Sequence, residues 1–110
     1  MNNLGVLGEE LAKNYLKNKK YKILECNYKT PIGEIDIVAK HKNTIVFVEV
    51  KTRANTKFGL PRESVTPFKQ SKIKQVATLY LKQNNALNIA VRFDVIDILN
   101  GEVTHIENAF

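Results

Sequence analysis

The chain has 110 residues, of which 44% are hydrophobic and 25% are charged. These proportions are typical of one globular domain, and they exclude a disordered tail, a collagen-like fibre and a low-complexity linker. The formal net charge is +6, and the single cysteine, Cys26, excludes an internal disulfide.

The first predicted element is a helix that begins after Asn3, a suitable N-cap, and extends to about Lys19. Its apolar residues recur at the spacing of one helix face. They are Leu4, Leu7, Leu11, Ala12, Tyr15 and Leu16. Glu9 and Glu10 fall outside this stripe, so the helix pattern alone predicts that both are solvated acids.

Three strands are predicted next, over residues 21–28, 34–40 and 44–51. A turn signal, Thr-Pro-Ile-Gly, separates the first two at residues 30–33, and a short hairpin loop at residues 41–43 separates the second and third. In the third strand, Ile45 and Phe47 share a face with Glu49 and Lys51, and three valines line the other face. We therefore expect both faces of this strand to be buried.

A second helix is predicted after a polar loop at residues 52–65. Thr66 and Pro67 are a good helix start, because a capping hydroxyl is followed by proline at the first helical position. Its apolar stripe is predicted to be Phe68, Ile73, Val76, Ala77 and Tyr80. Its other face is predicted to carry Lys69, Lys72 and Lys82.

The last two predicted strands cover residues 89–99 and 102–106, joined by the hairpin signal Asn100-Gly101. His105 alternates with Val103 there, which favours a structural role. The predicted order is αβββαββ, an α/β fold with a mixed β-sheet and flanking helices. We expect one domain over residues 1–110.

No segment is a candidate membrane span or signal peptide. The most apolar stretch, residues 45–50, is interrupted by Glu49 and is much shorter than the roughly 20 residues that cross a bilayer. The N-terminal residues include an acid by Glu9, which is not typical of a signal peptide. We expect a cytoplasmic protein with no membrane partner.

Positive charge is concentrated in residues 51–82, where the net charge is +7 and Glu63 is the one acid. The basic residues are Lys51, Arg53, Lys57, Arg62, Lys69, Lys72, Lys74 and Lys82. A basic block on a nearly neutral body indicates a polyanionic partner such as nucleic acid. A solvated surface has the same composition, so charge alone leaves both interpretations open.

Three residues in the second and third strands form a candidate site. If these strands pair as a hairpin, Asp36 and Glu49 can approach on one face, beside Lys51. Two carboxylates next to a lysine suit a hard cation such as Mg²⁺ or Mn²⁺, which can hold a phosphate and acidify a water. The alternatives are a solvated strand end and a local ion pair.

Asp36 followed by Glu49-Val50-Lys51 resembles the (P)D…(D/E)-x-K metal site of restriction-endonuclease-like nucleases. Nearly the whole chain is similar to the small bacterial YraN-like family, which is related in fold to archaeal Holliday-junction resolvases. The matching stretches are Gly5 with residues 8–12, Asn27-Tyr28, residues 33–38, residues 46–53, residues 58–61, Lys69, residues 92–95 and residues 105–110.

This resemblance implies a restriction-endonuclease-like core with an Mg²⁺ or Mn²⁺ site. Asp36 and Glu49 would be metal ligands, and Lys51 would be the catalytic lysine. Glu9 would reach the site from the first helix as a further catalytic, metal-binding acid. No proline directly precedes Asp36, a departure that the motif tolerates.

The leading expectation is metal-dependent hydrolysis of phosphodiester bonds in DNA, including Holliday junctions or flaps in repair or recombination. DNA is favoured over RNA. The nucleic-acid backbone would contact Arg53, Lys57, Arg62, Lys69 and Lys72. A homodimer is expected because two cuts need two sites, and a repair or recombination protein is an expected partner.

Two other functions are considered. One is a non-catalytic nucleic-acid-binding module that keeps the nuclease fold within a larger assembly. The other is a metal-binding or protein-interaction domain, which the +7 segment argues against.

Overall fold

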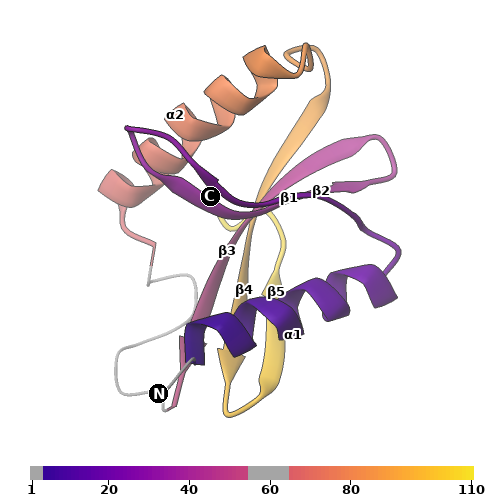
Figure 1. Ribbon diagram of the computed structural model, residues 1–110, viewed down its shortest axis with the longest axis vertical. Coiled ribbons are helices and arrows are strands. Elements are labelled where there is room, and N and C mark those ends of the chain that lie inside the picture. Colours follow the sequence, from indigo (N-terminus) through magenta and orange to yellow (C-terminus); the bar gives the residue numbers. More distant parts are fainter. Residues whose placement is uncertain (1–3, 55–64) are drawn as a thin grey trace.

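A twisted β-sheet runs through the middle of the molecule in the computed structural model, with one helix on each side (Figure 1). The structure describes residues 4–54 and 65–110. The elements in chain order are α1 (Leu4–Asn18), β1 (Lys22–Lys29), β2 (Glu34–His41), β3 (Thr44–Arg53), α2 (Pro67–Gln83), β4 (Ala90–Leu99) and β5 (Glu102–Ile106). The predicted α/β class and element order are confirmed, while the predicted N-cap, Asn3, lies outside the described residues.

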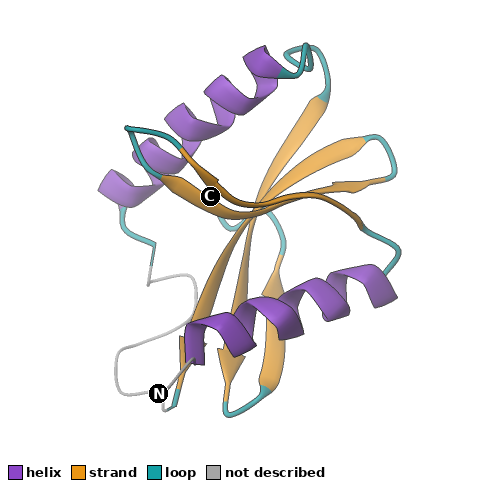
Figure 2. Ribbon diagram, in the orientation of Figure 1, coloured by secondary structure: helices purple, strands orange, loops and turns teal. Residues whose placement is uncertain are grey.

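The five strands lie in sequence order across the sheet. β3 and β4 are parallel and the other neighbouring strands are antiparallel, so the sheet is mixed as predicted. β3 is therefore the central strand. Figure 2 shows α1 and α2 on opposite sides of this sheet, with the turn between β1 and β2 passing beside α2.

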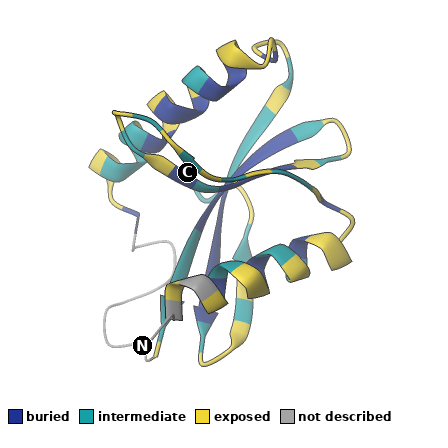
Figure 3. Cartoon of the chain, viewed as in Figure 1, coloured by how far each residue is buried: buried dark blue, intermediate teal, exposed yellow. Residues whose placement is uncertain are grey.

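Two apolar cores lie on the two faces of the sheet. Ile45 and Phe47 of β3 pack into the core that α2 covers. Val46 and Val48 pack into the core that α1 covers, which includes Leu16. The predicted burial of both faces of β3 is confirmed over residues 45–49, and its last four residues are half-buried (Figure 3).

The predicted helix start and hairpin turn are also confirmed. The Oγ1 atom of Thr66 accepts the N–H of Lys69 at 3.2 Å, and Pro67 is the first helical residue. Asn100 and Gly101 both have positive φ, 51° and 83°, which is the backbone of a type I′ turn. Neither helix in the described ranges is long and apolar enough to cross a membrane.

The N-terminal part of α1 lies tightly against the end of β3. A Cβ atom on Gly8 would lie 2.0 Å from Oγ1 of Thr52, so only glycine permits this approach. This contact positions the next residue, Glu9, near the end of the central strand.

The face of α2 differs from the prediction at its first turn. Phe68 was predicted to be in the apolar stripe, but its side chain is 72% exposed. Lys69 was predicted to be on the opposite face, but its Nζ reaches the buried Glu49 of β3. Each helical residue turns the chain by about 100°, so the position four residues before Ile73 shares its face and the position five before does not.

Candidate active site

Asp36 lies where β2 separates from β3. The pairing of these strands runs from His41 opposite Thr44 to Ile37 opposite Val48. Beyond that point, the N–H of Val50 donates to Oδ2 of Asp36 at 2.8 Å. The carboxylate thus accepts a bond from the β3 backbone at the point where the ladder ends. It is held beside Glu49, the residue before Val50.

Glu49 brings two lysines to the same point. Its side chain is 9% exposed, and its Oε1 lies 2.9 Å from Nζ of Lys69 and 3.8 Å from Nζ of Lys51. Lys51 follows Glu49 on the same face of β3, and Lys69 comes from the first turn of α2. The structure therefore joins two strands and one helix in a cluster of two acids and two lysines.

The carboxylate of Asp36 is poorly stabilised as an anion. Burial, and then the negative charge of Glu49, raise its pKa to about 7, and the bond from Val50 offsets only part of this effect. The charge of Glu9 also contributes, so α1 is within electrostatic range of Asp36. A cation placed beside Asp36 would relieve this repulsion.

The pKa values of Lys51 and Lys69 shift in opposite directions. Burial lowers the pKa of Lys51, and the adjacent Lys69 lowers it further. Burial also acts to lower the pKa of Lys69, but its contacts with Lys51 and Glu49 raise it overall. Lys69 therefore keeps its proton more firmly, and Lys51 is the lysine that loses its proton more easily.

Glu9 is held near this cluster by Asn27 of β1. The Nδ2 atom of Asn27 donates to Oε1 of Glu9 at 3.0 Å. Asn27 lies between Cys26 and Tyr28, which pair with the two neighbours of Asp36 on β2. Glu9 is thus directed toward the strand that carries Asp36, across β1.

The donors at this place fit a hard divalent cation. Asp36 and Glu49 supply carboxylate oxygens, and burial together with the charge of Glu49 leaves the ionised form of Asp36 poorly stabilised. In residues 4–54 and 65–110, no three acidic, histidine or cysteine side chains are close enough to form a ligand set by themselves. Asp36 and Glu49 are therefore the two candidate ligands; Mg²⁺ is commonly bound by one or two carboxylates, with water and substrate phosphates completing its shell.

Comparison with known proteins assigns the chain to a family. Residues 8–98 match the family described as "Uncharacterised protein family UPF0102". The chain belongs to the UPF0102 family. A UPF0102 protein of Clostridioides difficile is 53% identical over 108 residues, covering 96% of this chain and 95% of the relative.

Two other UPF0102 proteins are similar over nearly their whole lengths. One, from Caldanaerobacter subterraneus subsp. tengcongensis, is 50% identical over 114 residues, covering 97% of this chain and 93% of the relative. Another, from Syntrophomonas wolfei subsp. wolfei, is 50% identical over 111 residues, covering 97% of this chain and 96% of the relative. These matches agree with the YraN-like resemblance.

The predicted phosphate-binding residues of this UPF0102 protein have different surroundings. Lys69 contacts Glu49, whereas the Nζ of Lys72 lies 5.4 Å from the ring centroid of Phe68. Arg53 forms two bonds with the buried Asp97, at 2.7 and 3.1 Å, so its charge already has a structural partner. Its contact with phosphate stays a prediction. Lys57 and Arg62 lie outside the described residues.

Sequence reasoning missed the direct contact of Lys69 with the acids. A signal for it was present: Lys69 precedes Ile73, Val76 and Tyr80 by four, seven and eleven residues, the spacing of one helix face. Those three residues are buried in the core. A lysine in that series, at the first turn, points to the sheet and not to solvent.

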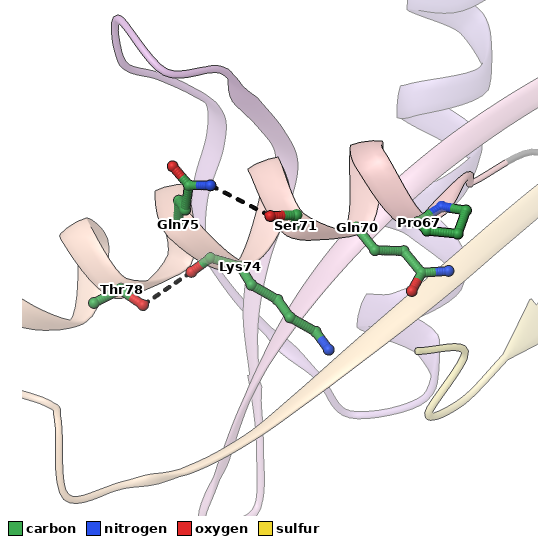
Figure 4. A pocket seen from close by; sticks show the side chains of 6 residues that line it. All are labelled: Pro67, Gln70, Ser71, Lys74, Gln75 and Thr78. Atoms are coloured by element: carbon green, nitrogen blue, oxygen red, sulfur yellow. Dashed lines mark hydrogen bonds between the residues drawn. The ribbon is translucent and has the colours of Figure 1, made fainter.

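A shallow hollow of about 420 Å³ lies on another part of α2 (Figure 4). Its described lining is Pro67, Gln70, Ser71, Lys74, Gln75 and Thr78. Lys74 there approaches the rings of Phe93 and Phe110, with Nζ 5.7 and 5.9 Å from their centroids. No carboxylate belongs to the lining that the described residues form.

Proposed function

We propose that this UPF0102 protein is a metal-dependent nuclease that hydrolyses phosphodiester bonds in DNA in the cytoplasm. One observation carries the proposal: two crowded carboxylates, Asp36 and Glu49, meet two lysines at the end of the central strand. The carboxylates of such a site suit a divalent cation, and its lysines suit the negative oxygens of a phosphodiester.

Asp36 and Glu49 would hold Mg²⁺ or Mn²⁺, and Glu9 of α1 would add negative charge near the ion without being a third direct ligand in this arrangement. When bound, the metal supplies Lewis-acid chemistry to a phosphoryl oxygen and to a water. The site fits this role because burial, and then the charge of Glu49, raise the pKa of Asp36 to about 7, and a cation would stabilise the ionised form against both effects.

The two lysines would act on the substrate itself. The ammonium of Lys69 would leave Oε1 of Glu49, which it contacts at 2.9 Å, and stabilise charge that develops on the phosphoryl oxygens. Lys51, whose pKa is lowered by burial, would orient the attacking water and can take up its proton. Water would attack phosphorus in line with the departing oxygen.

The resemblance to (P)D…(D/E)-x-K nucleases supports this assignment, since Asp36, Glu49 and Lys51 fill the positions of that motif. It also suggests a restriction-endonuclease-like core. Branched DNA, such as a four-way junction or a flap, is the proposed substrate, and a homodimer would supply the two sites that two cuts need. A repair or recombination protein is the proposed partner.

A cleavage assay tests the proposal. Labelled four-way junction, flap and linear DNA are incubated with wild type, Glu49→Gln or Lys51→Ala, in Mn²⁺ and, separately, in Mg²⁺. We expect wild type to cut at least one substrate and each variant to lose about a hundred- to a thousand-fold in rate, the usual loss for one charge-stabilising group.

Lys82→Ala is the matched control, because it removes an exposed lysine from the last turn of α2. It should cut like wild type. Wild type that cuts no substrate with either metal would contradict the proposal, as would variants that keep full activity.

The second candidate function is a nucleic-acid-binding module without catalysis. One observation favours it: Lys69 already forms an ion pair with Glu49, and a permanent pair would leave no room for metal. Binding to DNA in the absence of cleavage, unaffected by Mn²⁺, would support this candidate.

A further inference from the structure

Phe68 is an exposed aromatic residue beside the proposed nuclease site. At 72% exposure, it is the most exposed of the large hydrophobic side chains whose burial the structure describes. Its neighbour in the chain is Lys69, whose Nζ contacts Glu49. An apolar ring left in water next to a polar site gains free energy when a ligand covers it.

A lysine lies against this ring, on a helix whose charged residues are all basic. The Nζ of Lys72 lies 5.4 Å from its centroid, within the range of a cation–π contact. α2 carries Lys69, Lys72, Lys74 and Lys82 and has no Asp or Glu over Pro67–Gln83. A ligand for Phe68 therefore has to tolerate four lysines on the same helix, which favours one with negative charge.

We propose that Phe68 is a stacking platform for an unpaired base of the nucleic acid held at the site. A nucleic-acid strand offers what this surface lacks: a flat aromatic face for Phe68 and phosphates for Lys69 and Lys72. The inference rests on the proposed function for the place of the scissile phosphate. It narrows the substrate class to strands with unpaired nucleotides, such as single strands, flaps and junction centres.

Continuous duplex does not satisfy this geometry. Its bases are stacked on one another, and unstacking one costs a few kcal/mol. Bases that are already unpaired carry no such cost and present their faces freely. Phe68 should therefore add affinity for unpaired strands and little for blunt duplex.

A tryptophan probe tests stacking directly. The chain has no Trp, so Phe68→Trp introduces a unique fluorophore. The variant is titrated in EDTA with oligothymidylate and with blunt duplex that has the same number of phosphates. We expect strong quenching by the single strand and weak quenching by the duplex. Leu87→Trp, at another exposed apolar position, is the control and should respond weakly to both.

Dissociation constants test the energetic contribution. Phe68→Ala should weaken binding to oligothymidylate by about 5- to 150-fold, the loss for one base–aromatic stack. Binding to blunt duplex should change by less than about threefold. Phe68→Tyr keeps the aromatic face and should bind like wild type, whereas Phe68→Leu keeps only the apolar character and should bind like Phe68→Ala.

The outcomes separate this inference from the proposed function. Quenching and ring-dependent binding without cleavage support the platform and contradict the nuclease. Cleavage by wild type, together with equal binding of oligothymidylate by Phe68→Leu and wild type, supports the nuclease and contradicts the platform. No quenching, no nucleic-acid binding by wild type, or equal losses on single strand and duplex would each overturn the platform. Capture of an acidic peptide in place of oligonucleotide would overturn it as well.

Discussion

Two buried aspartates have opposite surroundings in this protein. Asp94 of β4 is completely buried, yet four donors surround its carboxylate. Oδ1 accepts from Nε of Arg92 at 2.9 Å and from the N–H of Asn108 at 3.1 Å. Oδ2 lies 2.9 Å from NH2 of Arg92 and 2.7 Å from Nε2 of His105.

Asp36 has one such bond and an acid nearby. Burial alone would raise the pKa of Asp94, but His105, Arg92 and the Asn108 N–H outweigh it and hold that pKa below its ordinary value. The pKa of Asp36 is instead raised to about 7. The difference teaches that burial alone does not mark a functional acid. An acid whose charge is left unrelieved is the better candidate for binding a cation.

Removing Asp94 should have the largest effect on stability. Asp94→Ala leaves the guanidinium of Arg92, a side chain 14% exposed, without its main anion. Breaking one partner of a buried pair costs about 3–5 kcal/mol. Urea unfolding at pH 7 measures this, and Asp94→Asn should lose less. A loss below about 1 kcal/mol for Asp94→Ala would mean that the network is not structural.

Asp36→Asn should raise the free energy of unfolding, whereas Asp94→Ala should lower it. The folded-state pKa of about 7 exceeds the ordinary value of 3.8, so ionisation of Asp36 removes stability as the pH rises from about 4 to above 7. Asparagine never ionises and can still accept the Val50 N–H. We expect Asp36→Asn to be about 1–3 kcal/mol more stable than wild type at pH 8, less than the full shift implies because the group is partly exposed.

The pH profile is the check on this sign. Urea unfolding from pH 4 to pH 8 should show the advantage of Asp36→Asn growing with pH and vanishing near pH 4. If Asp36→Asn were more stable than wild type by the same amount at every pH, the ionised carboxylate of Asp36 would not be the cause of the difference.

Metal should stabilise the protein through the Asp36–Glu49 site and not through the Asp94 network. Mn²⁺ at ten times its dissociation constant should raise the free energy of unfolding of wild type by about 1.4 kcal/mol. Glu49→Gln should lose this gain because it removes a charged ligand, whereas Tyr15→Phe should keep it. Thermal unfolding with and without Mn²⁺ measures this stabilisation. Equal stabilisation of wild type and Glu49→Gln by Mn²⁺ would rule out Glu49 as a ligand.

Tyr15→Phe itself should have the smallest effect. The hydroxyl of Tyr15 lies 3.3 Å from Nδ1 of His105, at the margin of the Asp94 network. Losing this one neutral hydrogen bond should cost about 0.5–1 kcal/mol in urea unfolding. A much larger loss would show that the hydroxyl orients His105 and, through it, the whole network.

The sequence predicted much of the fold because its signals are local. Thr66-Pro67 and Asn100-Gly101 fix a helix start and a turn through contacts within a few residues. The alternation along β3 predicted which of its residues face each core. For the candidate site, the same alternation correctly put Glu49 and Lys51 on one face of the strand.

Other partners of the charged residues lie far away in the sequence and came only from tertiary structure. Val50 donates to Asp36 from 14 residues away, and Arg53 bonds Asp97 from 44 residues away. Such pairs depend on strand register and on how the helices pack, which no local spacing encodes. The sequence by itself determined the elements, their order and the residue types at the strand ends. Tertiary structure alone decided that His105 and the N–H of Asn108 join Arg92 around Asp94, that Asp36 is left poorly stabilised, and that Lys69 contacts Glu49 while Phe68 faces water.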